Sequence, residues 1–99
     1  MVTESTNTTN HVNGLTLEQL QALSLRRLAY LIKANWPKVY FGAKPYLDAM
    51  TSLETVSDAY GCDDGRSIVR YFLVNATTWR GDIARKVKAE LQRRLKGGR

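Results

Sequence analysis

Apolar residues recur at helical spacing in four segments of this 99-residue chain, and residues that start or end helices bound most of them. The first segment is 17–36. Thr16 and Gln19 form a capping-box pattern at its start, and Pro37 disfavours helical geometry at its end. Ser24 would suit the start of a second helix within this segment, but we predict a single helix with an irregularity there.

The second segment follows Pro45, a residue that suits the first turn of a helix. The spacing predicts a helix that continues to Tyr60, with Gly61 as its stop. Residues 37–44, between the first two helices, are too short and too rich in Gly and Pro for a strand, so we predict an extended connector. The apolar positions of the second segment share one side of a helical wheel: Tyr46, Ala49, Met50, Leu53, Val56 and Tyr60.

The third segment, residues 66–78, is apolar around most of a helical wheel, which predicts a buried central helix. A carboxylate from Asp63 or Asp64 would cap its first turn and interact favourably with the helix dipole. The β-branched residues of this segment would also suit a strand, but the helix is our prediction.

The fourth segment predicts a last helix that begins after Thr77 or Thr78 and ends near Lys96. Together the segments predict an all-α fold, a compact bundle of about four helices that forms a single helical domain over residues 14–99. Residues 1–13 are rich in Thr, Asn and Ser and contain no apolar run. Their composition predicts a disordered N-terminal tail.

The last predicted helix separates apolar from basic residues. Ile83, Val87, Leu91 and Leu95 recur every four residues and form an apolar stripe. Arg94 projects close to this stripe, so we predict that it either extends its charge to solvent or pairs with a carboxylate on a neighbouring helix. The opposite face, with Lys88 to one side, is basic: Arg85, Lys86, Lys88, Gln92, Arg93 and Lys96.

The net charge of +6 is located entirely in this C-terminal segment. Residues 1–79 contain seven basic and seven acidic residues, whereas residues 80–99 contain eight basic and two acidic ones. Glu90 is the only acidic residue between Arg85 and Arg99, so we expect that pairing within the helix cannot neutralise the face. Such asymmetry suggests an anionic partner.

Two interpretations of the basic face are open. Lys and Arg are good helix formers that favour helix C-termini, so the face would simply be solvated. Alternatively, it tracks the phosphates of nucleic acid through counterion release. The second hypothesis extends only to non-specific binding, because Gln92 is the one amide on the face that would read a base edge.

The connector mixes aromatic and basic side chains, which form a second candidate for partner contact: Trp36, Lys38, Tyr40, Phe41 and Lys44, with Tyr46 beyond them. Exposed rings flanked by cations are typical of single-strand binding. We favour the other interpretation, in which a small protein needs these rings to close its core between two helices. Rings exposed together would equally suit a protein partner.

Catalytic and metal-binding patterns are not found in the sequence, and we predict a protein that is not an enzyme and needs no cofactor or metal. The single histidine, His11, lies in the predicted tail, away from any nucleophile. Cys62 has no histidine or second cysteine nearby, and a calcium loop from Asp63 would require a carboxylate where Val74 stands. No apolar run is long enough to span a membrane, and the N-terminus lacks the basic and apolar features of a secretory signal. We therefore expect a cytoplasmic protein.

Two stretches of the chain carry a family resemblance. KVYFGAKPYLDAM and DDGRSIVRYFLVNATTWRGDIARKVKAELQRRL resemble small uncharacterised helical proteins encoded by tailed bacteriophages, over residues 38–96. The resemblance implies a compact helical accessory protein that acts in the host cytoplasm of an infected bacterium. It carries over no activity and no functional residues, and residues 1–37 do not contribute to it.

Three functional hypotheses follow from the sequence. The favoured one is a small accessory protein that associates non-specifically with nucleic acid through its basic C-terminal helix. The alternative is a protein-interaction module, either a homodimer or an inhibitor of a host protein, that presents its aromatic and basic surface to an acidic partner. The third is a subunit of a larger assembly whose basic charge faces nucleic acid or an acidic neighbour.

Overall fold

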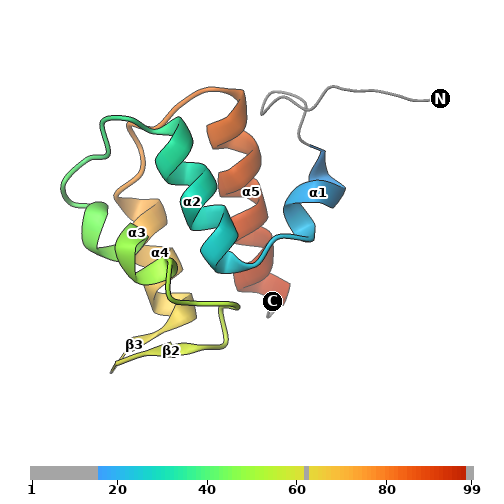
Figure 1. Ribbon diagram of the computed structural model, residues 1–99, viewed down its shortest axis with the longest axis vertical. Helices are drawn as coiled ribbons and strands as arrows, with labels where there is room; N and C mark the ends of the chain where they lie inside the picture. Colours follow the sequence, from blue (N-terminus) through green and yellow to red (C-terminus); the bar gives the residue numbers. More distant parts are fainter. Residues whose placement is uncertain (1–15, 62, 98–99) are drawn as a thin grey trace.

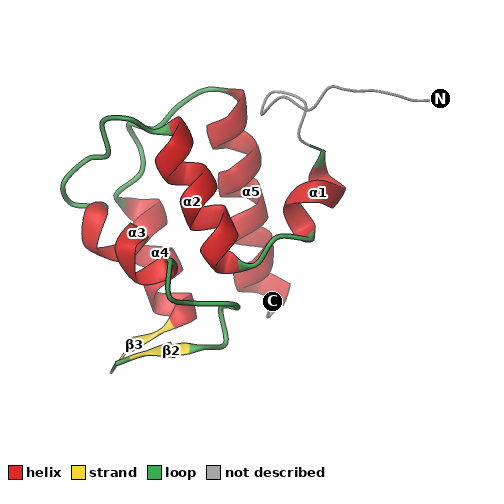
Figure 2. Cartoon of the chain, in the orientation of Figure 1, coloured by secondary structure: helices red, strands yellow, loops and turns green. Residues whose placement is uncertain are grey.

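The computed structural model describes residues 16–61 and 63–97, which form five helices and one pair of two-residue strands (Figures 1 and 2). The predicted all-α fold is confirmed. The predicted tail over residues 1–13, together with His11 and Cys62, lies outside the described residues. No helix in the described ranges is long and apolar enough to cross a membrane.

The first predicted helix is in fact two helices, α1 (Leu17–Gln21) and α2 (Leu25–Asn35). The capping box at α1 is confirmed, since the Gln19 N–H donates to Thr16 Oγ1 at 3.1 Å and the Thr16 N–H donates to Gln19 Oε1 at 2.9 Å. Our prediction of a single helix with an irregularity at Ser24 is wrong, because Ser24 is extended and its Oγ accepts the Arg27 N–H at 3.2 Å. A serine that caps a new helix competes with continuation of the old one.

The second predicted helix is much shorter than its apolar pattern, because α3 (Lys44–Met50) ends ten residues before Tyr60. Asp58 provides the physical reason. Its Oδ2 accepts the backbone N–H groups of Glu54 at 2.8 Å and Thr55 at 3.2 Å, which organises the following residues as turns. The chain then forms β2 (Ala59–Tyr60), which pairs antiparallel with β3 (Asp63–Asp64).

The third predicted helix is α4 (Gly65–Val74), and Asp64 caps it by accepting the Ser67 N–H at 2.8 Å. Gly65 is required here, because a Cβ at this position would lie 2.8 Å from the Val56 carbonyl oxygen. The prediction that α4 is buried on nearly all sides is wrong. Ile68, Val69 and Phe72 are buried, but Tyr71 and Val74 are exposed.

The last helix, α5 (Asp82–Gly97), begins later than the predicted start at Thr77 or Thr78. The residues before it bring Trp79 into the core, where its ring stacks on Trp36 with centroids 5.7 Å apart and Phe72 contacts Trp36 edge-on at 6.2 Å. Trp79 Nε1 also donates to the Asn35 carbonyl at 3.1 Å, which satisfies an acceptor at the C-terminus of α2. Burial of one indole therefore explains the delayed helix start.

The helices surround a single core in which α5 is the central neighbour. α5 contacts α1, α2 and α4, while α3 packs against α2 and α4 (Figure 1). The connector between α2 and α3 lies at the end of the molecule opposite the β2–β3 pair (Figures 1 and 2). The two predicted candidate surfaces therefore lie on the outer side of α5 and at the connector end.

Candidate nucleic-acid interface

The predicted basic face of α5 is exposed in part, but much of its charge is paired within the helix. Arg85 pairs with Asp82, one turn earlier. Arg93 is bidentate to Glu90, with its Nε 2.9 Å from Oε1 and its Nη2 2.7 Å from Oε2. Pairing within the helix thus engages both arginines of the face, but Glu90 is shared with Arg94, so the face as a whole stays basic, as we expected.

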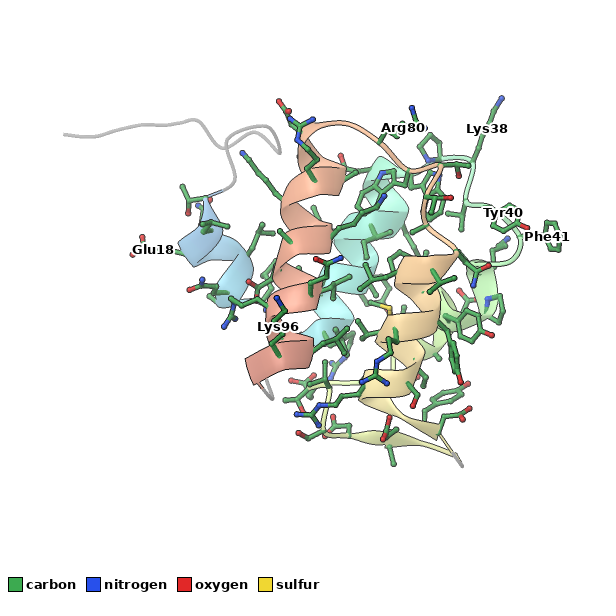
Figure 3. The ribbon with its side chains drawn as sticks, turned by 180° about the vertical axis from the view of Figure 1, so that it is seen from behind. Glu18, Lys38, Tyr40, Phe41, Arg80 and Lys96 are labelled. Atoms are coloured by element: carbon green, nitrogen blue, oxygen red, sulfur yellow. The ribbon has the colours of Figure 1, made fainter. Side chains whose placement is uncertain are left out.

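The remaining predicted residues of the face differ in their exposure. Lys88 is half-buried, and its Nζ donates to the Trp79 carbonyl at 2.6 Å. Lys86 is also half-buried and makes contacts of its own. Gln92 and Lys96 are exposed, and Lys96 lies toward the C-terminal end of α5 (Figure 3). The solvent-facing charge of α5 is accordingly smaller than its composition indicates.

Arg94 lies on the inner side of α5 and is only 4% exposed. Its Nε donates to Glu90 Oε2 at 2.6 Å, so its carboxylate partner is on the same helix rather than on the neighbouring helix that we considered. Its Nη2 donates to the carbonyls of Leu20 at 2.9 Å and Leu23 at 2.7 Å. Arg94 thereby satisfies the acceptors at the end of α1 and fastens α1 to α5.

Glu90 is buried with Arg94, at 1% exposure. Burial raises the pKa of its carboxyl, but the hydrogen bonds and charges of Arg93 and Arg94 outweigh burial, so the pKa lies below its usual value. The carboxylate is ionised at neutral pH and holds both guanidinium groups. This cluster therefore serves the packing of α5 rather than recognition by a partner.

The structure divides the aromatic residues of the connector between the core and the surface. Trp36 is buried in the stack with Trp79, as the favoured interpretation of the connector expected. Tyr40 and Phe41 are not in the core, since they are 43% and 77% exposed, and their rings contact each other with centroids 4.9 Å apart. For these two rings, the core interpretation is wrong.

A second pair of rings, Tyr46 on α3 and Tyr71 on α4, lies 5.4 Å apart. The connector and α4 approach each other at Gly42, where a Cβ would lie 2.5 Å from Tyr40 Cε2 and 2.9 Å from Asn75 Oδ1. Asn75 directly follows α4, so the first ring pair lies against the end of the helix that carries the second. We call these side chains, together with the exposed Val74 near the end of α4, the aromatic patch: Tyr40, Phe41, Tyr46, Tyr71 and Val74.

Three exposed cations surround the connector end, and we call Lys38, Lys44 and Arg80 the connector cations. Within residues 16–61 and 63–97, none of them forms a salt bridge with a described carboxylate. Figure 3 shows Lys38 and Arg80 at the same end of the molecule, with Tyr40 and Phe41 beside them. Burial lowers the pKa of the Lys88 ammonium, and the charge of Arg80 lowers it further. Arg80 thus lies close enough to Lys88 for their positive charges to repel each other.

A cavity of about 270 Å³ lies beside the connector, between the end of α2 and α3. Trp36, Val39 and Leu47 form its apolar side. Lys33 and Asp48 line its rim and pair with each other, with Nζ 2.8 Å from Oδ1. Lys44 also lines the cavity, which places one connector cation between the cavity and the aromatic patch.

Sequence reasoning missed Arg80, Tyr71 and Val74 as surface residues near the connector. The sequence did contain a signal for Arg80. It follows Trp79, a large apolar residue expected in the core, and a charged residue next to a buried one is expected at the surface. Tyr71 and Val74 carried no such signal, since an apolar helix face looks the same in sequence whether or not another element covers it. The described residues contain no group of three or more His, Cys, Asp or Glu side chains that would hold a metal ion.

No protein-family model, curated protein or solved structure matches this chain.

Proposed function

We propose that this protein associates with nucleic acid without base specificity, and that the connector end makes the principal phosphate contacts. The observation that carries the proposal is the set of connector cations, Lys38, Lys44 and Arg80, which are exposed and make no salt bridge with a described carboxylate. A cation without a carboxylate partner can neutralise a phosphate and release its counterions, whereas an ion pair has no net charge to do so.

The proposal retains the functional class that we expected from the sequence but changes the surface. Arg85 and Arg93 of α5 are already paired with Asp82 and Glu90, so a phosphate would compete with an existing partner at both positions. Lys96 extends the positive surface along α5 and would add a further contact. Bases are not recognised individually in this proposal, and the protein is not an enzyme.

The test is fluorescence anisotropy of a labelled random single strand and a labelled random duplex at about 50 and 200 mM salt, where phosphate contacts lose affinity. The double variant Lys38→Gln/Arg80→Gln removes two unpaired cations. The matched control Arg26→Gln/Arg85→Gln removes the same charge from two exposed ion pairs, with Glu54 and Asp82. We expect the first variant to lower the slope of log affinity against log salt by about 2, one for each phosphate contact.

The control variant should change the salt slope much less, because its arginines are already paired with carboxylates and make few phosphate contacts. Equal losses in the two variants would reduce the effect to net charge and would contradict a role for the connector end. Absence of binding by the unmodified protein at the lower salt concentration would contradict the proposed function as a whole.

A second candidate function is a protein-interaction module, and the exposure of Phe41 and Val74 favours it, at 77% and 71%. Contiguous apolar patches on a protein surface often mark the sites where partners bind. Sedimentation velocity over a hundredfold range of protein concentration tests the homodimer form of this candidate. A sedimentation coefficient that rises with concentration, and no longer does so in Phe41→Ala, would support it.

A further inference from the structure

We infer that Tyr40 and Phe41 form a stacking platform for the bases of a single strand, so that the protein prefers single-stranded to duplex nucleic acid. This inference rests on the proposed function and adds the class of nucleic acid that the connector end selects. The geometry that supports it is a pair of adjacent rings, 4.9 Å apart and inclined at 54°, with Phe41 more exposed than any other large apolar residue in the described ranges.

The backbone beneath the two rings is held in a defined turn. The Ala43 N–H donates to the Tyr40 carbonyl at 2.8 Å, and the Lys44 N–H donates to the Phe41 carbonyl at 3.3 Å. Rings attached to an ordered turn lose little conformational freedom when a base stacks on them, which is how preorganisation raises affinity. The platform therefore does not need to fold around its ligand.

The position of Tyr40 is set by Gly42 and Asn75. Glycine leaves the space that the Tyr40 ring fills, because a Cβ at residue 42 would lie 2.5 Å from Cε2. Asn75 lies on the other side of that space, and its Nδ2 donates to the Tyr71 carbonyl at 2.9 Å, so the amide is itself fixed. Tyr40 is thus supported from below, while Phe41 points away from the helices (Figure 3).

The charges around the platform suit a nucleic-acid backbone. Lys38 and Lys44 lie two and three residues from the ring pair in sequence, and Arg80 lies at the same end of the molecule (Figure 3). A strand whose bases stack on the rings would place its phosphates within reach of long basic side chains on either side. Duplex bases are already stacked and paired, so the rings would have no free base face to contact. The platform therefore separates single strands from duplexes by geometry.

The first test measures the affinity of Phe41→Ala, Phe41→Leu and Phe41→Trp for a labelled twelve-residue thymidine oligonucleotide and for a random duplex. Stacking requires a π-face, so we expect Phe41→Ala and Phe41→Leu to lose roughly 10-fold or more in single-strand affinity. Phe41→Trp should retain or increase that affinity. Duplex affinity should remain within about twofold in all three variants, since the phosphate contacts are unchanged.

The control is Tyr60→Ala, which removes an exposed ring from β2 at the opposite end of the molecule; its exposure, 47%, is close to that of Tyr40 (Figure 1). Its single-strand affinity should not change. Gly42→Ala is a second probe, because the added Cβ displaces the Tyr40 ring without altering any charge. We expect it to weaken single-strand binding and leave duplex binding unchanged.

Several outcomes would overturn the inference. If Phe41→Ala and Phe41→Leu both bind the single strand as tightly as the unmodified protein, while Lys38→Gln/Arg80→Gln weakens the binding of both nucleic acids, the platform is wrong and the proposed function stands. If Phe41→Leu matches the unmodified protein and only Phe41→Ala fails, the side chain acts as an apolar contact, as in a protein interface. If the unmodified protein binds neither ligand, the proposed function and the platform both fail.

Discussion

The α1–α5 contact and the connector each reverse the usual placement of a residue type, burying charge in one and exposing an apolar ring in the other. Glu90 and Arg94 are charged but buried, and each finds its partners within the protein. Phe41 is apolar but 77% exposed, and the cations near it have no described carboxylate partner. The comparison teaches that residue type does not locate a binding surface. Unused interaction capacity does, and the connector end combines both kinds, exposed rings and cations without a described carboxylate partner.

The physical difference lies in what each region does for folding. A buried carboxylate and guanidinium are costly to desolvate and are tolerated only when their hydrogen bonds are complete. Arg94 meets that condition through Glu90 and the carbonyls of Leu20 and Leu23. An exposed Phe contributes little burial free energy, so the connector rings are not explained by stability. Three predictions test this contrast.

The largest expected effect is on the buried pair. Glu90→Gln leaves the Arg94 guanidinium buried without a negative partner, and breaking a buried pair in this way costs about 3–5 kcal/mol. Urea denaturation at pH 7, followed by circular dichroism, would measure the loss in the free energy of unfolding. Glu54→Gln, which breaks only the exposed pair with Arg26, is the control and should have little effect. Equal losses in the free energy of unfolding for Glu90→Gln and Glu54→Gln would contradict a special role for the buried pair.

Acid should also weaken the α1–α5 contact, because it protonates the Glu90 carboxylate that holds Arg94. The pKa of Glu90 is lowered in the folded protein, and so are those of Asp58 and Asp64, which accept backbone N–H groups. A lowered carboxyl pKa contributes stability that is fully present above the unfolded pKa of about 4 and is lost as the pH falls through the folded value. We expect the urea midpoint to be constant from pH 7 to about pH 5 and to fall below that.

Glu90→Gln should show a smaller acid-dependent fall in the urea midpoint than the unmodified protein, because one of the three carboxyls is gone. An identical pH profile in the two proteins would assign the acid sensitivity to Asp58 and Asp64 alone.

The smallest expected effect is on the connector. Phe41→Ala should change the free energy of unfolding by less than about 0.5 kcal/mol, because the ring is mostly in water already. Phe72→Ala removes a fully buried ring and should cost about 3–5 kcal/mol. Thermal and urea unfolding of both variants would compare the two sites. A large loss in Phe41→Ala would show that the connector ring supports the fold and would remove the reason to assign it a binding role.

Local signals allowed part of this fold to be predicted from the sequence. The caps at Thr16 and Asp64 involve residues three positions apart, so the sequence contains the whole interaction. The early end of α3 depends on Asp58, and the late start of α5 depends on Trp79 entering a core made by distant residues. The Trp79 contacts are tertiary, whereas the Asp58 hydrogen bonds are local, three and four positions apart, and helical periodicity contains neither.

The candidate site was harder to predict than the fold for a similar reason. Composition gave the sign of the charge but not its partners, and Asp82 and Glu90 change what Arg85 and Arg93 offer to a ligand. Trp36 directly precedes the connector that contains Phe41 and has similar chemistry, yet Trp36 is buried and Phe41 is exposed. The choice between them depends on which ring reaches Trp79 and Phe72, and this requires the folded structure.

The stack of Trp36 on Trp79 has a spectroscopic consequence. These are the only two tryptophans in the chain, and their indoles are held 5.7 Å apart and inclined by 13°. The tryptophan signal of the folded protein, in absorption and in fluorescence, therefore comes from this one stacked pair. Trp36 leads into the connector and Trp79 precedes Arg80. The protein therefore carries an intrinsic optical label at the very end of the molecule where we propose that a strand binds.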